Sequence, residues 1–381
     1  MSLRIGINGY GRIGRCFLRA LQESSLRDQL CVVAINEPAD IESMAYLTRF
    51  DSTHGRFPGK VEVCGETLCI DEWCIQVSHA RTPQEVDWRA LDLDLLVEAS
   101  GQYASRRELD AFLDAGCPRI LLSHPGHSAE DVDRTIVFGS NHETLTGNER
   151  IVSAASCTTN AIVPVLAMLD AACGIEHAMM TTLHSVMNDQ PPIDGYHHAD
   201  LRRTRSSMQS IIPVATGLAR GVARLLPQLA DRVEAKSIRV PVTNVSAIDL
   251  VATLTRPGTV AGINASLRRA VDQGFPGQIA YTEEAHASVD FNHSPHSAII
   301  DASQTRMSGP QLVNLLIWFD NEWGFANRML ELAAFWGRRM PPADAVAPSA
   351  RRPASANSRI RPGRVSRPPA RAARAARPCR R

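Results

Sequence analysis

The stretch LRIGINGYGRIGR, residues 3–15, joins a short apolar run to a glycine-rich turn and the start of a helical pattern. Leu3 to Asn8 predict a strand, and Gly9, Gly11 and Gly14 follow in the spacing G-x-G-x-x-G. Gly9 permits the tight turn, Gly11 lets the backbone approach a pyrophosphate, and Gly14 allows the helix to pack closely on the strand. Because the free N–H groups of a helix start favour an anion, the stretch predicts a Rossmann-type dinucleotide-binding domain.

An acidic residue follows the second predicted strand. Leu30 to Asn36 predict that strand, and Glu37 comes 23 residues after Gly14. A carboxylate here accepts hydrogen bonds from the adenine ribose hydroxyls and repels a 2′-phosphate, which favours NAD over NADP. A glycine-rich turn alone can be purely structural, so the prediction depends on strand, turn, helix, strand and acid occurring in this order.

Two further apolar runs predict parallel strands of the same sheet. They are LDLLVEASG (93–101) and RILLSHPG (119–126), and an amphipathic segment from Arg106 to Ala115 separates them. In such sheets, ligands bind beyond the carboxyl ends of the strands. The residues at these ends, and so the candidates to line a cofactor cleft, are Ser100, Gly101 and Ser123.

The stretch SAASCTTNAIVPVLAML, residues 153–169, places Cys157 among serine and threonine at the front of an apolar run. Residues 150–155 predict a short strand, and residues 161–169 predict a buried helix. Cys157 has two readings. It is either a small buried hydrophobe, as free cysteine often is, or a nucleophile whose thiolate is stabilised by the positive end of the helix dipole.

The other cysteines indicate a reducing compartment. The chain has nine cysteines, an odd number, without a C-x-x-C pair, which fits the cytoplasm better than a disulfide framework. We expect most of the eight besides Cys157 to be core residues. Cys64, Cys69 and Cys74 lie in an alternating segment typical of a hairpin, and we expect them in the core or at a sheet edge. Their spacing follows no zinc pattern, and no metal site is predicted.

The composition predicts a sizeable core and no membrane anchor. A chain of 381 residues with 44% hydrophobic content is long enough for two domains. No run approaches the roughly 20 apolar residues of a membrane helix. The first residues, MSLRIGING, enter a strand directly and leave no room for a signal peptide. These features predict a cytoplasmic protein without a membrane partner.

The charge is unevenly distributed along the chain. From Pro341 onward there are 11 Arg, no Lys and one acidic residue, whereas the first 340 residues carry 30 basic and 39 acidic side chains. This Arg-, Pro- and Ala-rich tail, residues 341–381, is predicted to be disordered. It is either a basic arm for nucleic acid or an anionic surface, or an extension without a role. We favour the second reading because a basic tract alone is weak evidence.

A dinucleotide site and a candidate nucleophilic thiol in one chain predict the oxidation of an aldehyde. The thiol adds to the carbonyl, hydride leaves for the nicotinamide, and a second nucleophile opens the resulting thioester. His184, at the end of the strand-like run AMMTTLH, is the candidate base. A lone histidine is more often structural, and its partnership with Cys157 is what favours the catalytic reading. Residue types that suit phosphate oxygens occur at Arg203, Thr216, Gly217 and Arg239.

Six segments resemble, in order and spacing, the glyceraldehyde-3-phosphate dehydrogenase superfamily over residues 2–337. They are INGYGRIGR, DSTHGRF, SCTTNAIVPV, DLRRTR, SIRVP and WFDNEWGFANRM. The resemblance implies a nucleophile at Cys157, an activating base at His184 and a homotetramer. The implied cofactor-binding residues are Asn8, Gly9, Gly11, Arg12, Ile13, Gly14, Glu37, Arg81, Ser100, Gly101, Ser123 and Asn321. The implied substrate-binding residues are Ser156, Thr158, Asp189, Arg203, Thr216, Gly217 and Arg239.

The resemblance also implies an α/β architecture in three segments. They are an NAD-binding domain (1–155), an α/β catalytic domain with a mixed sheet (156–320), and a C-terminal helix returning to the NAD-binding domain (321–340). The tail (341–381) follows them and has no counterpart in the family pattern.

One stretch, HSVMNDQPPIDGYHHADLRRTR, is most similar to the erythrose-4-phosphate dehydrogenases of this superfamily. The glycolytic enzymes usually carry Thr three residues after the catalytic His, whereas this chain has Met187. The expectation is therefore oxidation of D-erythrose 4-phosphate to 4-phosphoerythronate with NAD, the thioester being opened by water, in pyridoxal 5′-phosphate biosynthesis. The alternative is a phosphorylating glyceraldehyde-3-phosphate dehydrogenase. The pair Thr216-Gly217 resembles the sequence of the glycolytic enzymes at this position.

Overall fold

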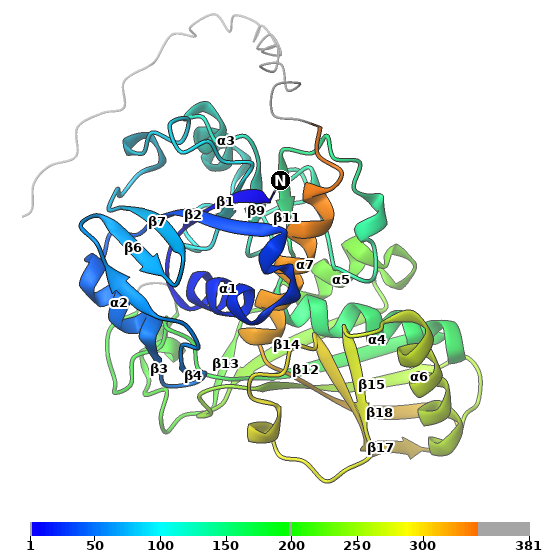
Figure 1. The fold of residues 1–381 in the computed structure, drawn as a ribbon. Coiled ribbons are helices and arrows are strands. Elements are labelled where there is room, and N and C mark those ends of the chain that lie inside the picture. The colour runs from blue at the N-terminus through cyan, green and yellow to red at the C-terminus, as the bar shows by residue number, and fades with distance from the viewer. Residues whose placement is uncertain (1, 198–199, 342–381) are drawn as a thin grey trace, which may run out of the picture. The chain divides into compact units, whose positions relative to one another are not determined.

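The computed structural model describes residues 2–197 and 200–341. Its larger sheet has nine strands, parallel from β10 to β7 and antiparallel at β6 and β5 (Figure 1). In spatial order they are β10 (Arg134–Thr135), β11 (Ile151–Ser153), β9 (Ile120–Leu122), β8 (Leu95–Glu98), β1 (Leu3–Asn8), β2 (Leu30–Asn36), β7 (Trp73–Ser78), β6 (Thr67–Ile70) and β5 (Val61–Val63). The parallel part carries the predicted glycine-rich turn at the carboxyl end of β1.

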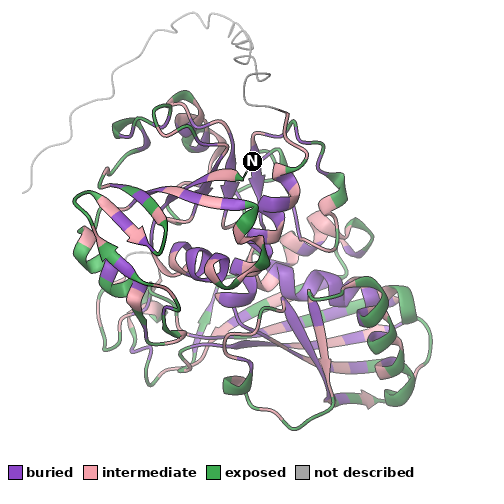
Figure 2. Ribbon diagram, viewed as in Figure 1, coloured by how far each residue is buried: buried purple, intermediate pink, exposed green. Residues whose placement is uncertain are grey.

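Helices cover both faces of this sheet because its strands bury side chains on both sides. On one face, α1 (Arg12–Glu23) and α7 (Trp323–Gly337) pack in one core with Ile5, Ile7 and Val97. On the other face, α3 (Arg106–Asp114) packs with the intervening residues Leu96 and Ile120. Because side chains alternate along each strand, they enter two separate cores. Figure 2 shows buried residues of these strands in purple between the helices.

The second sheet has seven strands of mixed direction. In spatial order they are β13 (Ile212–Val214), β14 (Val233–Arg239), β12 (Ile175–His184), β15 (Ser246–Leu254), β18 (Leu312–Phe319), β17 (Ala298–Ser308) and β16 (Ile279–Thr282). One face packs against α4 (Cys157–Cys173), α5 (Leu218–Leu225) and α6 (Val260–Gly274). Because side chains alternate along β12, His184 is buried like Met180 on this strand, while Met179 and Leu183 are exposed.

Shorter elements complete the described chain. They are α2 (Ile41–Arg49), the hairpin β3 (Phe50–Asp51) and β4 (Gly55–Arg56), and six 3₁₀ segments at Ser25–Asp28, Pro83–Glu85, His142–Thr144, Leu201–Thr204, Pro227–Leu229 and Ser288–Phe291. Across the described ranges, we find no helix with the length and hydropathy that crossing a membrane requires.

The predicted fold class is confirmed, and several predicted elements match closely. The strands at Leu3–Asn8 and Leu30–Asn36 have the predicted bounds, and the amphipathic segment from Arg106 forms α3. The helix expected after Cys157 is longer than predicted, because it begins at the cysteine itself and ends at Cys173. The boundaries at 155, 320 and 340 stay predictions, and the tail from residue 342 lies outside the described residues.

The expectation that most other cysteines are core residues is wrong. Of the seven described besides Cys157, three are buried, namely Cys16, Cys117 and Cys173. Cys64 and Cys74 are exposed, while Cys31 and Cys69 are partly exposed. The reason is that the three-stranded antiparallel extension β5–β6–β7 has one covered face: Leu68, Ile70, Ile75 and Val77 fill that face, and the cysteines take the alternate positions.

Candidate functional site

The glycine-rich turn has the geometry that a dinucleotide requires. Gly9 has φ +88°, in the left-handed region, and a Cβ there would lie 2.4 Å from the backbone of Ser100. A Cβ on Gly14 would lie 2.3 Å from the carbonyl oxygen of Gly9, so the helix can pack this closely on the turn only with glycine at position 14. A Cβ on Gly11 would meet nothing within 4 Å, and among the described residues no side chain caps the start of α1. The turn therefore leaves open backbone N–H groups for a pyrophosphate.

Glu37 lies beside this turn and holds it. Its carboxylate accepts hydrogen bonds from the backbone N–H of Tyr10 at 2.7 Å and of Ala39 at 3.2 Å. Each carboxylate oxygen has a further lone pair, so these bonds leave acceptor capacity for ribose hydroxyls. The predicted position of Glu37 at the end of β2 therefore brings it to the glycine-rich turn.

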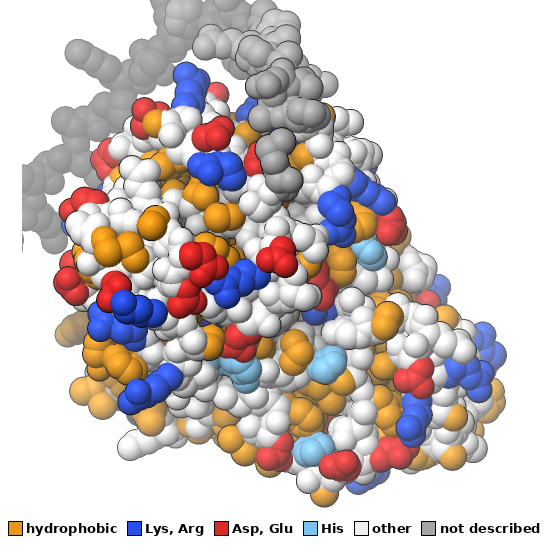
Figure 3. All heavy atoms as spheres, in the orientation of Figure 1, with side chains coloured by type: hydrophobic (Ala, Val, Ile, Leu, Met, Phe, Trp, Pro, Cys, Tyr) orange, Lys and Arg blue, Asp and Glu red, His pale blue; other side chains and the backbone are white. Residues whose placement is uncertain are grey.

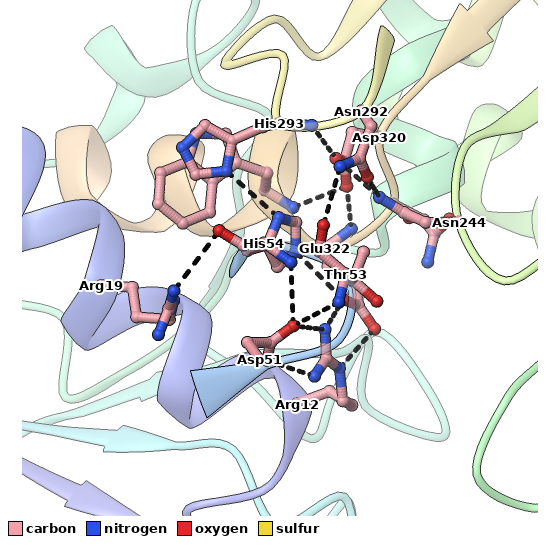
Figure 4. Close-up of polar contacts among 12 residues, drawn as sticks. Arg12, Arg19, Asp51, Thr53, His54, Asn244, Asn292, His293, Asp320 and Glu322 are labelled. Atoms are coloured by element: carbon pink, nitrogen blue, oxygen red, sulfur yellow. Dashed lines mark hydrogen bonds and ion pairs between the residues drawn. The ribbon is translucent and has the colours of Figure 1, made fainter. Parts of the chain in front are cut away.

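Arg12 lies on the first turn of α1, but its guanidinium does not face the turn. It forms a bidentate pair with Glu322 and bonds Asp51 at 2.5 Å (Figure 4). Burial opposes ionisation of Asp51, yet the Arg12 guanidinium and the N–H of His54 hold the pKa of this carboxyl well below its usual range. The Arg12 side chain therefore ties α1 to residues 51 and 322. What Arg12 and Ile13 can offer to an anion is their backbone at the start of the helix.

The other predicted cofactor residues lie at the carboxyl ends of neighbouring strands. The N–H of Ser100 donates to Glu98 at 2.8 Å, and that of Ser123 donates to the carbonyl of Glu98 at 3.0 Å. Gly101 has φ +71°, which turns the chain after β8. Arg81 is exposed beyond the end of β7, and its backbone N–H donates to Glu85 at 2.8 Å. The structure thus gathers the predicted set along one edge of the sheet, with Arg81 at its periphery.

A tight turn between β11 and α4 places the thiol. Ala155 has φ +60°, which is uncommon for a residue other than glycine. Ser153 Oγ accepts its N–H at 3.0 Å, and Asn160 Nδ2 donates to the carbonyl of Ala154 at 2.8 Å. Ser156 caps the helix by accepting the N–H of Thr159 at 3.1 Å. These bonds hold Cys157 at the first position of α4.

His184 faces the thiol from the end of β12. Its Nε2 lies 3.9 Å from Cys157 Sγ, and its Nδ1 lies 2.9 Å from the carbonyl oxygen of Ser185. A carbonyl accepts only, so Nδ1 carries the proton and Nε2 presents a lone pair to the sulfur. The imidazole is therefore oriented as a proton acceptor for Cys157.

Burial disfavours the charged form of both groups. Burial, and then the Arg239 guanidinium, lower the pKa of His184 to about 4. Burial raises the pKa of the Cys157 thiol, and its contacts with Thr158 offset this only in part. Burial of the sulfur thus opposes the stabilisation of the thiolate that is expected from the helix start, and the role of Cys157 as a nucleophile stays a prediction. The lone pair of Nε2, 3.9 Å from Sγ, can accept the thiol proton as the sulfur attacks.

A cavity of about 320 Å³ opens beside the thiol. The predicted residues that line it are Ser156, Cys157, Thr158, His184, Thr216, Gly217 and Arg239, together with Met187. Arg239 is partly buried and donates to the Ser185 carbonyl at 3.4 Å. The cavity therefore joins the nucleophile, the base and a cation, which is the arrangement that an anionic aldehyde requires.

Two predicted substrate residues lie outside this lining. They are Arg203 and Asp189. Arg203 donates to Asp189 at 2.8 Å, and both side chains are partly exposed to solvent.

Asn321, a predicted cofactor residue, is buried, and its amide oxygen accepts hydrogen bonds from Ser185 Oγ and Ser246 Oγ, each at 2.9 Å. With the oxygen fixed, its Nδ2 is the free group of the amide. The two serines are positioning residues that sequence reasoning missed.

Sequence reasoning also missed Arg220 and Arg224, which line the cavity from α5. Arg220 Nη2 lies 3.4 Å from where a Cβ on Gly217 would be, and Arg224 donates to Thr135 Oγ1 at 3.2 Å. Their signal was present in the sequence, since arginines four residues apart share one face of a helix, and α5 begins directly after Thr216-Gly217.

One group of potential metal ligands occurs within the described ranges. Cys16, His54 and Glu322 bring one ligand atom each within 4.8 Å of the others. The Glu322 carboxylate is already paired with Arg12, and burial raises the pKa of Cys16 well above its usual range. A second cation beside Arg12 is electrostatically unfavourable, and we assign no metal here.

The parallel sheet with its glycine-rich turn and the adjacent thiol–imidazole cavity define an NAD-dependent oxidoreductase. Two family comparisons specify it further. Residues 3–106 match the NAD-binding domain of glyceraldehyde 3-phosphate dehydrogenase, and residues 156–321 match the C-terminal domain of the same enzyme. The chain belongs to the glyceraldehyde 3-phosphate dehydrogenase family, whose members oxidise aldehyde phosphates with NAD.

Proposed function

We propose that this family member oxidises D-erythrose 4-phosphate to 4-phosphoerythronate, with Cys157 as nucleophile and His184 as base. The observation that carries the proposal is Met187, whose side chain lines the cavity three residues after His184. A thioether offers no O–H donor to a phosphate oxygen. A residue that bears a hydroxyl at this position would supply one.

Residues of this chain supply the protein part of the mechanism. Cys157 Sγ bonds to the carbonyl carbon while its proton passes to Nε2 of His184, whose Nδ1–H stays on the Ser185 carbonyl. The chemistry that NAD⁺ supplies when bound is hydride acceptance, which turns the adduct on Cys157 into a thioester. The open N–H groups after Gly11 would hold its pyrophosphate, Glu37 its ribose, and Asn321 its carboxamide.

The second nucleophile decides between the two candidate reactions. Water attacks the thioester carbon, the carbon–sulfur bond breaks, and the free acid leaves as the thiol regains a proton. Phosphorolysis needs inorganic phosphate held beside the thioester. Thr216 and Gly217 line the cavity and suit this task, which is the observation that favours the glycolytic alternative. The same groups, with Arg220, can instead hold the phosphate of the substrate itself.

The four-carbon substrate also fits the distribution of cations. Its phosphate lies one carbon farther from the aldehyde than that of glyceraldehyde 3-phosphate. Arg239 lies near the thiol, whereas Arg220 and Arg224 extend the positive lining along α5. A longer aldehyde phosphate can therefore keep its carbonyl at Cys157 and its phosphate at α5.

Steady-state rates of NADH formation test the proposal. With saturating NAD⁺, we expect a higher kcat/KM for erythrose 4-phosphate than for glyceraldehyde 3-phosphate, and turnover without added phosphate. Met187→Thr should recover part of the glyceraldehyde 3-phosphate activity. One polar contact contributes about 0.5–1.5 kcal/mol, so the change in preference should be roughly two- to tenfold.

Met208→Thr is the matched control, because Met208 is exposed outside the cavity lining. Strict dependence on inorganic phosphate in the wild-type enzyme would establish the glycolytic alternative.

We further propose a homotetramer that acts in the cytoplasm, in pyridoxal 5′-phosphate biosynthesis. Exposed apolar side chains support an assembly, because large apolar surfaces commonly mark interfaces. They include Met179, Ile193, Tyr196, Leu201 and Ile211. All eight described cysteines are free, which is in keeping with a reducing compartment.

Nucleic acid is not proposed as a partner. On the face in Figure 3, basic and acidic side chains are interspersed over the described residues. The basic segment that leaves such binding open, residues 342–381, lies outside them.

A further inference from the structure

A carboxylate at the cofactor edge of the larger sheet has no role in the reaction described above. Glu98, the last residue of β8, is fully buried. Its oxygens accept hydrogen bonds from Asn8 Nδ2 at 2.5 Å, from the Ser100 N–H at 2.8 Å and from Ser100 Oγ. All of these partners are uncharged. Burying a carboxylate without a cation is costly, which argues that its position serves a purpose.

Glu98 joins the two segments that form the floor of the cofactor cleft. Asn8 immediately precedes Gly9, and the glycine turn touches the Ser100 backbone so closely that a Cβ on Gly9 would lie 2.4 Å from it. Glu98 bonds both sides of that contact. The polar chain continues across the strand ends, since Asn8 Oδ1 accepts from Asn36 at 2.8 Å and Asn36 Oδ1 accepts from Ser78 at 2.9 Å.

We propose that Glu98 is a positioning residue for NAD, which as a carboxylate fixes Asn8 and Ser100 in the geometry that binds the dinucleotide. Protonation places a hydrogen on an oxygen that already faces N–H or O–H donors, so one of the donors loses its acceptor. The turn and the Ser100 segment are then held less firmly. Proton binding at Glu98 and NAD binding to the cleft therefore oppose each other.

The environment of Glu98 makes this competition relevant near neutrality. Burial raises the pKa of Glu98 to about 7, while the bonds from Ser100 and Asn8 act in the opposite direction. Three neighbouring titratable groups have shifted pKa values. Burial raises the pKa of Cys117 and of Tyr103, which also sense the charge of Glu98, and burial lowers the pKa of His124 after β9. Glu98 is thus a buried group beside the cleft whose charge changes near pH 7.

Because the proposed role of Glu98 is in cofactor binding, calorimetric titration with NAD⁺ tests it without any aldehyde. If only the ionised form binds, the competent fraction falls to about one in eleven at pH 6, and the Kd should rise about tenfold from its value at pH 8. Glu98→Gln should bind NAD⁺ more weakly at pH 8 and show a flat pH profile.

Two variants serve as comparisons. Glu62→Gln, an exposed carboxylate on the edge strand β5, should retain the wild-type profile. Glu98→Asp should retain the pH dependence but bind NAD⁺ more weakly. The shorter side chain keeps a carboxylate but places it farther from Asn8 and Ser100. A wild-type Kd that is constant from pH 6 to 8 would overturn the proposal even if Glu98→Gln failed to fold. So would a Glu98→Gln enzyme that keeps the wild-type pH dependence.

Discussion

Replacing His184 with Asn removes the acceptor for the thiol proton. In the structure, the lone pair of Nε2 faces Cys157 Sγ at 3.9 Å because Nδ1 is tied to the Ser185 carbonyl. A positioned acid–base group contributes roughly 10²–10⁴-fold to a rate, which corresponds to about 3–5 kcal/mol of transition-state stabilisation. We expect His184→Asn to lower kcat/KM by this factor and to slow alkylation of Cys157 by iodoacetamide at pH 7.

The pH dependence follows from the same geometry. Since burial and Arg239 lower the pKa of His184 to about 4, the imidazole stays unprotonated well below neutrality. At saturating NAD⁺, protonation of His184 should begin to reduce the wild-type rate only below about pH 5. The unfolded chain binds this proton below about pH 6.5, so acidification toward pH 4 should cost about 3 kcal/mol of folding stability through His184. His184→Asn should lack that part of the acid destabilisation.

The assay needs a control on the same strand. His177 is exposed on β12, and His177→Asn should leave the rate, the alkylation and the acid profile unchanged. Initial rates of NADH formation give kcat/KM, and denaturant titrations at several pH values give the free energy of unfolding. A His184→Asn enzyme within threefold of the wild-type rate, with unchanged alkylation, would refute the assignment of the base.

Four further outcomes are expected. Cys157→Ser should abolish oxidation and keep NAD binding, measured calorimetrically, because a hydroxyl lacks thiolate character. Glu37→Ala should narrow the preference for NAD over NADP in kcat/KM; equal use of both cofactors by the wild-type enzyme would contradict its role. Arg220→Ala should raise the KM for the aldehyde phosphate several-fold at constant NAD affinity. Removal of residues 342–381 should leave the Tm and the activity unchanged, since this segment offers almost no apolar surface to bury.

Local patterns in the sequence predicted the elements that carry the site. The first two strands have the predicted bounds because apolar runs ending in glycine or an acidic residue leave little choice of register. The turn before Cys157 was predictable from its serine and threonine residues, which cap helix starts. These features depend on neighbours in the chain, and the sequence therefore sufficed.

Features that depend on distant residues were not predictable in this way. The guanidinium of Arg12 is held by Asp51, which is 39 positions away in the chain, and by Glu322, which is 310 positions away. The thiol pKa depends on how completely the surrounding elements desolvate the sulfur, which a helix start alone does not reveal. Glu98 reads as one acid in an apolar strand, and its importance appears only when Asn8 and Ser100 are seen to converge on it.

The nature of the product tests the central claim most directly. Wild-type enzyme, NAD⁺ and erythrose 4-phosphate are incubated in phosphate-free buffer prepared with ¹⁸O-labelled water, and the product is examined by mass spectrometry and ³¹P NMR. If water opens the thioester on Cys157, NADH accumulates and the carboxylate of 4-phosphoerythronate carries one ¹⁸O beyond any label that exchanged into the aldehyde. Absence of turnover until inorganic phosphate is added, with an acyl phosphate as the product, would contradict the account.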